Sequence, residues 1–173
     1  RYAYDHGIAG KTMVVETDAG LVPGERLDEN TYRVQLNNPG VLDLHRKGDI
    51  AYVELGNPGV PHAVAAYKGD LWADADSLRE EMRALRFDPA FPKGANVNYY
   101  QSLEPGVVRI LTFERGVEDF TLACGTGGGS VACVLWLEGK LPESTLTAHS
   151  RGGTLKYTVS GGNGVVTSLL LEG

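Results

Sequence analysis

The 173-residue chain is poor in cysteine, methionine and tryptophan, with two of each, and aromatic residues make up only 8% of it. It also lacks an excess of positive charge, because the formal net charge is −6. Such a surface argues against binding to nucleic acids or to anionic membranes. No apolar run approaches the roughly 20 residues of a membrane-spanning helix, and no basic-then-apolar leader opens the chain. We therefore expect a cytoplasmic protein.

The scarcity of cysteine argues against a disulfide-stabilised fold. Cys124 and Cys133 lie nine positions apart in what we expect to be one helix, which separates them by about 13 Å. A disulfide tolerates at most about 7 Å between α-carbons. Two free thiols fit a reducing compartment, and Cys133 stands among apolar neighbours that suit a core residue.

An apolar content of 42% is ordinary, and a chain of this length can bury one good core or two small ones. Ser77 and Glu80 form a capping box that predicts a helix over residues 77–86, and a second, apolar helix is expected over 127–138. Short strands with two or three helices predict an α+β fold wrapped around the apolar helix. The expected strands cover residues 11–17, 31–36, 50–55, 63–67, 107–113, 146–150, 154–159 and 165–171. The expected irregular segments are a turn at 18–20, a polar connection at 22–30, and a loop at 56–61 that brings His62 to the head of a strand.

Residues 114–129 contain the most distinctive pattern in the sequence. Cys124 lies where a strand meets the apolar helix, and glycines occupy positions 125, 127, 128 and 129. The first N–H groups of a helix have no partner within it and the helix dipole is positive there, so an anion can be held and a thiol can ionise. Glycines also let a ligand approach the backbone. The structural alternative is a buried cysteine in a close-packed glycine-rich turn.

Three motifs in this order resemble the second half of the diaminopimelate epimerases: FPKGANVN at residues 91–98, ERG at 114–116 and ACGTG at 123–127. Pro61-His62 and the turn at 151–155 add to the resemblance, which covers nearly the whole chain. It implies two similar α+β domains, each with mixed or antiparallel strands wrapped around a central helix, and an active site between them. Residues 1–7 resemble the end of a helix that follows a first catalytic cysteine, which we expect upstream of this chain.

On this resemblance, residues 1–38 are the tail of the first domain, residues 39–160 form the second domain with Cys124, and residues 161–173 are a final strand that returns to the first. The candidate domain junction lies at residues 37–40.

The resemblance implies epimerisation of LL-2,6-diaminopimelate to the meso form, for lysine and cell-wall synthesis. Two cysteines on opposite faces of the α-carbon exchange its proton, without pyridoxal phosphate, metal or other cofactor. This chain supplies one of the two, so it should be inactive alone. We expect a small-molecule substrate, no nucleic acid and no membrane, and we consider a homodimer.

The resemblance also implies roles for individual residues. It makes Cys124, Glu114 and His62 catalytic. It assigns substrate binding to Asn96, Arg115, Gly125 and Thr126, with Arg115 gripping the far carboxylate through two hydrogen bonds. Structural alternatives exist: His62 could cap a strand, Glu114 and Arg115 could be a solvated pair, and Asn96 could bond its own backbone in a turn.

Three departures from the family pattern bear on the substrate. Val60 stands where an asparagine is common, and Phe120 stands before Thr121 where a carboxylate is common. Residues 167–170 replace an expected Thr-Gly-Pro-Ala signature. The alternatives are a racemase of the proline, hydroxyproline or histidine type, and a catalytically silent binding domain of the same fold.

Overall fold

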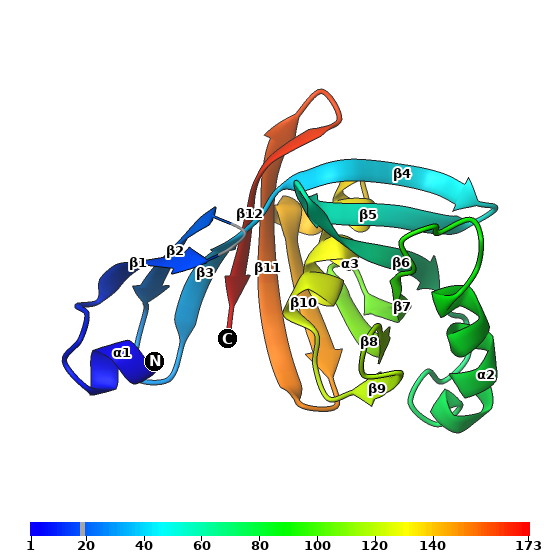
Figure 1. Cartoon of the computed structure of the whole chain (residues 1–173), viewed down its shortest axis with the longest axis horizontal. Coiled ribbons are helices and arrows are strands. Elements are labelled where there is room, and N and C mark those ends of the chain that lie inside the picture. The colour runs from blue at the N-terminus through cyan, green and yellow to red at the C-terminus, as the bar shows by residue number, and fades with distance from the viewer. Residues whose placement is uncertain (18–19) are drawn as a thin grey trace.

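A computed structural model describes residues 1–17 and 20–173, so two positions of the turn expected at 18–20 lie outside the described residues. A single sheet curls around one buried helix (Figure 1). The helices are α1 (Tyr2–Asp5), α2 (Ala75–Arg86), α3 (Gly125–Leu137) and the 3-10 helix η1 (Pro142–Ser144). The strands are β1 (Thr12–Thr17), β2 (Gly20–Arg26), β3 (Tyr32–Leu36), β4 (Pro39–Lys47), β5 (Ile50–Gly56), β6 (Gly59–Ala66), β7 (Asn96–Glu104), β8 (Val107–Glu114), β9 (Asp119–Thr121), β10 (Thr145–Ser150), β11 (Gly153–Gly162) and β12 (Val165–Glu172).

The strand order is β1-β2-β3-β12-β11-β10-β8-β7-β6-β5-β4, and β9 pairs with β8 outside this path. The pairs β6–β7 and β8–β10 are parallel, and the other pairs are antiparallel. The expected α+β class, with mixed strands wrapped around a central helix, is confirmed. Among the described residues, no helix is long and apolar enough to cross a membrane.

Helix α3 is apolar on all sides because strands surround it. Every residue from position 127 to 135 is buried, as expected for a helix without a solvent face. Cys133 is fully buried there, and both cysteines are free, so the absence of a disulfide between them is confirmed. This core includes Val53, Val64 and Ile110 from the surrounding strands.

Helix α2 covers the opposite face of the sheet with its own apolar stripe. Leu78, Met82 and Leu85 are buried at helical spacing. They share a second core with Tyr52 and Phe113, which alternate along their strands with residues that face α3. The sheet is thus largely apolar on both faces around these two cores.

Two predictions of irregular structure are wrong. The polar connection expected at 22–30 contains most of β2, even though it carries Pro23 and Gly24. Pro23 pairs with Val14 of β1 but lies just before the part of β2 that pairs with β3, so its missing N–H does not interrupt that ladder. The loop expected at 56–61 is a tight hairpin between β5 and β6, with a cis bond from Asn57 to Pro58.

The predicted capping box of α2 is also wrong. The helix begins two residues earlier than predicted, with Asp74 as its N-cap. The Ser77 hydroxyl donates to the carbonyl of Asp74 at 2.7 Å and caps no amide. The predicted end before Pro89 is confirmed, since α2 ends at Arg86.

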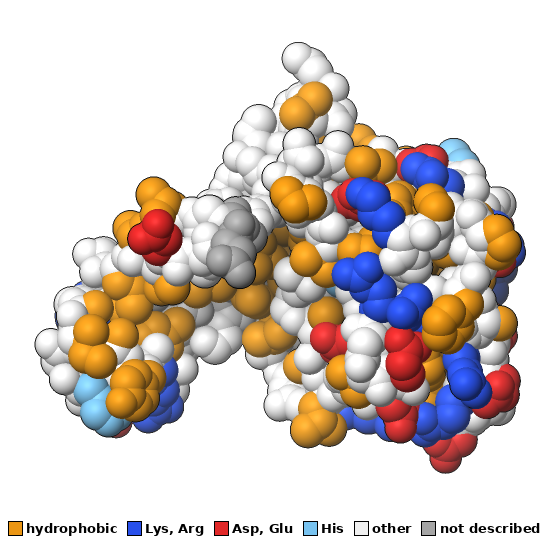
Figure 2. Space-filling view, in the orientation of Figure 1, with side chains coloured by type: hydrophobic (Ala, Val, Ile, Leu, Met, Phe, Trp, Pro, Cys, Tyr) orange, Lys and Arg blue, Asp and Glu red, His pale blue; other side chains and the backbone are white. Residues whose placement is uncertain are grey.

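Strands β1, β2, β3 and β12 form a separate wing of the sheet (Figure 1). Figure 2 shows hydrophobic side chains gathered on this wing, whereas charges of both signs are mixed over the other part. An open groove of about 510 Å³ crosses the wing and is lined by the apolar residues Met13, Val14, Pro23 and Leu170 and by the polar residues Thr12, Glu25, Arg33 and Gln35. An apolar sheet face normally packs against a second layer.

Candidate active site

Cys124 is the N-cap of α3 and has an extended backbone, with φ −129° and ψ 108°. Its sulfur accepts a hydrogen bond from the amide of Gly127 at 3.3 Å and lies 3.6 Å from the Thr126 hydroxyl. The amide of Gly125 has no acceptor in residues 1–17 and 20–173. The start of α3 therefore offers a thiol beside an N–H group that can bind an anion.

Burial raises the pKa of the Cys124 thiol above its ordinary value. The Thr126 hydroxyl and the Gly127 amide act in the opposite direction, and the negative charge of Glu114 adds to the rise. Burial thus opposes the ionisation that the helix start favours. A neutral thiol at neutral pH is suited to donating a proton.

The strand registers bring polar residues to the face of the sheet that carries α3. In the parallel pair β6 and β7, His62 lies opposite Asn96, and side chains two positions apart share a face. Asn98 is therefore on this face, as is Thr112, which lies opposite it on β8. Glu114 follows on the same face at the end of β8. Three neighbouring strands thus supply polar groups to the side that packs against α3.

Arg115 leaves the sheet beside Asn96. Its backbone N–H donates to Oδ1 of Asn96 at 2.9 Å, and Nδ2 of Asn96 donates to the carbonyl of Pro61 at 3.2 Å. The Asn96 side chain therefore makes its hydrogen bonds mainly to backbone groups. The exposed guanidinium of Arg115 donates to the carbonyl of Lys93 at 2.9 Å, and its other donors have no acceptor in the described part of the chain. The described contacts thus do not pair Arg115 with Glu114, which leaves its guanidinium open to an anionic ligand.

His62 is fully buried in the middle of β6, where the sequence predicted the head of a strand. Burial, and to a lesser extent the charge of Arg115, lower the pKa of His62 to about 3. The ring is therefore neutral at physiological pH. Its Nδ1 atom lies 3.1 Å from Nδ2 of Asn98, whereas its buried Nε2 atom has no partner among residues 1–17 and 20–173.

Asn98 and Thr112 are not among the predicted site residues, although both are buried at the centre of this patch. The Thr112 hydroxyl donates to Oδ1 of Asn98 at 2.9 Å. A Cβ at Gly127 would lie 2.2 Å from that same Oδ1, so the first turn of α3 rests directly on Asn98. Alternating polar residues in Asn96-Val97-Asn98 were the available signal, because they place two amides on one face of a buried strand.

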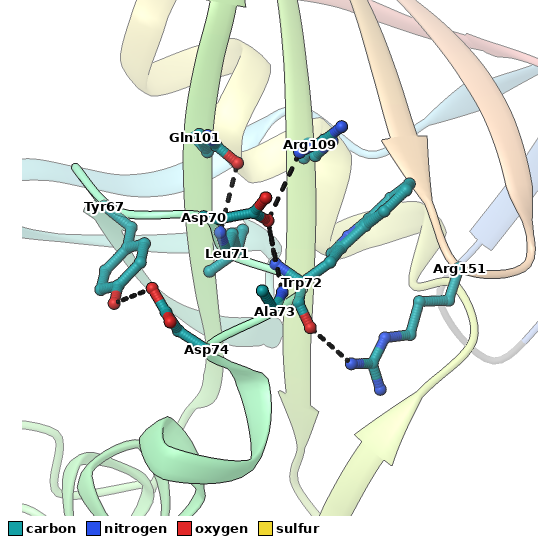
Figure 3. Close-up of polar contacts among 9 residues, drawn as sticks. All are labelled: Tyr67, Asp70, Leu71, Trp72, Ala73, Asp74, Gln101, Arg109 and Arg151. Carbon is teal, nitrogen blue, oxygen red and sulfur yellow. Dashed lines mark hydrogen bonds and ion pairs between the residues drawn. The ribbon is translucent and has the colours of Figure 1, made fainter.

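The segment before Cys124 is held in place from the turn between β10 and β11. The amide of Gly152 donates to the carbonyl of Leu122 at 2.7 Å, and a Cβ at Gly152 would come within 3.0 Å of Leu122. Arg151 extends from the same turn and donates to the carbonyl of Trp72 at 3.3 Å (Figure 3). This turn therefore joins the segment of Cys124 to the loop before α2.

That loop is itself well anchored (Figure 3). The Asp70 carboxylate accepts hydrogen bonds from the amides of Trp72 and Ala73, both at 3.2 Å. The Arg109 guanidinium lies 4.8 Å from the centre of the Trp72 ring and contacts Asp70 at 3.4 Å. Among the described residues, no group of three or more His, Cys, Asp or Glu side chains could hold a metal ion.

We expect an alkylating reagent to modify Cys124 much faster than Cys133 in the folded chain. Cys124 is partly exposed, whereas Cys133 is fully buried and burial raises its pKa to about 12. Because both thiols have raised pKa values, labelling of Cys124 should speed up with increasing pH beyond the ordinary cysteine range. Peptide mapping by mass spectrometry measures both rates, and equal labelling would argue against an active-site role for Cys124.

The sequence profile of the diaminopimelate epimerase family matches residues 53–169. Diaminopimelate epimerases of Aquifex aeolicus and a Hydrogenobaculum species are 34% and 36% identical to the chain. These alignments cover 88% and 92% of this chain but 56% and 59% of those proteins. The chain therefore spans somewhat more than half the length of the curated relatives that it matches.

Solved structures share the fold at lower identity. A probable proline racemase from Agrobacterium radiobacter, with bound carbonate, superposes with a TM-score of 0.66 at 20% identity, over 99% of this chain and 61% of that one. A phenazine biosynthesis protein of the PhzF family from Bacillus anthracis gives 0.66 at 12% identity, over 99% and 69%. At these identities the likeness shows the fold alone.

Proposed function

Because this chain belongs to the diaminopimelate epimerase family, we propose that it supplies one of two acid/base cysteines that epimerise LL-2,6-diaminopimelate to the meso form. The observation that carries the proposal is the Cys124 thiol at the N-cap of α3, next to the Gly125 amide, which has no acceptor among residues 1–17 and 20–173 and can bind a carboxylate. The reaction would need no cofactor and would serve lysine biosynthesis.

In the proposed step, one face of the α-carbon loses a proton and the opposite face gains one. A thiolate on the far face takes the α-proton, and the electron pair of the broken C–H bond remains on the α-carbon and its carboxylate. Cys124 then gives its thiol proton to the near face and becomes a thiolate. The reverse reaction begins from that thiolate. Amides of Gly125 and Thr126 would hold the α-carboxylate, so the developing negative charge meets preorganised N–H donors.

The other site residues would act around this exchange. The charge of Glu114 raises the pKa of Cys124, so we assign it a part in keeping the thiol protonated before the transfer. His62, which lies on β6, would tune the position of the proton that is exchanged. Arg115 would bind the distal carboxylate, and Asn96 would hold the Arg115 backbone in place and contribute its remaining N–H.

We also propose the two-domain division of the parent protein. Residues 1–38 would belong to the first domain, residues 39–160 to the second, and residues 161–173 would return to the first. The pairing of β12 with β3 and the uncovered groove on that wing support this division, because the rest of a first domain would supply the missing layer. The cytoplasm is the proposed location.

The chain alone tests the two-thiol mechanism. Two-base inversion needs a group on each face of the α-carbon, and Cys133 is buried in the core, so residues 1–173 should not interconvert the stereoisomers at a useful rate. Chiral chromatography after incubation with LL-diaminopimelate measures this, with a full-length diaminopimelate epimerase as positive control. Substantial turnover by the chain alone would contradict the mechanism.

Arg115→Lys in the full-length protein tests the substrate. Lysine keeps the charge but cannot make two parallel hydrogen bonds, so we expect kcat/KM for diaminopimelate to fall by about ten- to a hundredfold, corresponding to about 1.5–3 kcal/mol. Steady-state assays should include proline and histidine as competing substrates. An unchanged kcat/KM, or a wild-type preference for a substrate without a distal carboxylate, would favour another amino-acid racemase.

A further inference from the structure

Asn98 connects His62 to the start of α3. Its Nδ2 lies 3.1 Å from Nδ1 of His62, and its Oδ1 lies where a side chain at Gly127 would otherwise stand. Gly127 in turn donates its amide to the sulfur of Cys124. One continuous path of contacts thus runs through the interior, from His62 to Asn98, from Asn98 to Gly127, and from Gly127 to Cys124.

The surroundings fix which way the Asn98 amide points. Its Nδ2 is 3.2 Å from the carbonyl of Ala63 and 3.1 Å from the carbonyl of Asn96. Carbonyl oxygens only accept hydrogen bonds, so the atom that faces them must be the NH₂ group. Rotating the amide by half a turn would place three oxygens together in a buried site and leave the Thr112 hydroxyl against a nitrogen.

The amide orientation in turn determines the proton on His62. The two N–H donors of this group are shared among the two carbonyls and Nδ1 of His62. A protonated Nδ1 would set donor against donor at 3.1 Å, so Nδ1 must face the NH₂ group with its lone pair. A neutral imidazole with a bare Nδ1 carries its proton on Nε2. That N–H is buried and unpartnered among residues 1–17 and 20–173, and a buried donor without an acceptor is costly.

We propose that Asn98 is a positioning residue that holds His62 as the neutral Nε2–H tautomer, which leaves a buried hydrogen-bond donor on the Nε2 side of the ring. The role of this donor in catalysis rests on the proposed function, but the tautomer itself does not. In this arrangement His62 cannot act as a base through Nδ1, because Asn98 occupies that lone pair. Under the proposed function, its Nε2–H would be the group available to stabilise negative charge.

Nitrogen NMR on the folded 173-residue chain tests the proposal directly. We expect His62 to show an unprotonated Nδ1, a protonated Nε2, and a through-hydrogen-bond coupling between Nδ1 and Nδ2 of Asn98. The variant His62→Gln assigns the signal among the four histidines of the chain. A protonated Nδ1 in the wild-type chain at neutral pH would overturn the proposal, whatever the outcome of any activity assay.

Two variants separate positioning from simple packing. Asn98→Leu keeps a similar volume but removes the donor, so the coupling should vanish and the Nδ1 resonance should move. Thr112→Val removes only the donor to Oδ1 and should leave the coupling in place. His62 nitrogen signals that are unchanged in Asn98→Leu would overturn the proposal. If Asn98→Leu fails to fold, the wild-type coupling still decides it. Failure of the epimerase assays would leave these signals unaffected, which distinguishes the two proposals.

Discussion

Replacing Cys124 with serine in the full-length protein is expected to lower kcat for epimerisation by about 10²- to 10⁴-fold, the usual contribution of a positioned acid or base. A serine hydroxyl is far too weak an acid to exchange the α-proton at this rate. It is, however, a favoured N-cap, so it should still accept the Gly127 amide that now bonds the sulfur. The free energy of unfolding should therefore remain the same or increase.

The matched control is Cys133→Ser on the same helix. Cys133 is fully buried in the apolar core, where an added hydroxyl costs about 1–3 kcal/mol of stability. The kcat of the Cys133→Ser variant, measured on folded protein, should remain close to that of the wild type. Urea unfolding and steady-state kinetics on both variants should thus give opposite patterns. Full activity in Cys124→Ser would rule out this thiol as an acid/base group.

Gly127→Ala is expected to lower the free energy of unfolding by about 2–4 kcal/mol, through overpacking and the loss of buried hydrogen bonds. The new Cβ would lie 2.2 Å from Oδ1 of Asn98. Asn98 cannot move away without breaking its bonds to Thr112 and to the carbonyl of Ala63. The expected loss is net of the better helix propensity of alanine, which acts in the opposite direction.

Gly125→Ala is the control for this prediction, since it lies in the same turn of α3. Its Cβ would meet only the end of the Leu171 side chain, at 3.2 Å, and that end can rotate away. We expect a change within about 0.5 kcal/mol. Equal urea midpoints for Gly127→Ala and the wild-type chain would show that the close contact with Asn98 is not rigid.

The sequence predicted the elements whose signals are local. The glycine-rich turn at Cys124 followed by an apolar run predicted α3, and simple alternation predicted most strands. Local signals failed where strand pairing determines whether a segment becomes a strand. β2 forms despite Pro23 and Gly24 because β1 and β3 pair with it on either side. Helix α2 begins at Ala75, with Asp74 rather than Ser77 at the N-cap position, and the Asp74 side chain caps no amide.

The site shows the same division. Cys124, Glu114 and Arg115 lie close together in the sequence, so motifs identify them. The contact between His62 and Asn98 joins residues 36 positions apart and depends on the parallel register of β6 and β7, which no local pattern fixes. Likewise, the sequence reveals that Cys124 lies at a helix start but not how deeply it is buried, and it is this burial that raises its pKa.

The last strand of the chain completes the middle of the sheet, and this has a consequence for folding during synthesis. β12 lies between β3 and β11, and its Glu172 bonds Arg33, 139 positions earlier. Until β12 emerges from the ribosome, the facing edges of β3 and β11 have no partner and can pair with other chains. Contacts between such distant residues also form slowly. The emergence of residues 165–172 thus determines how long the nascent chain remains prone to aggregation.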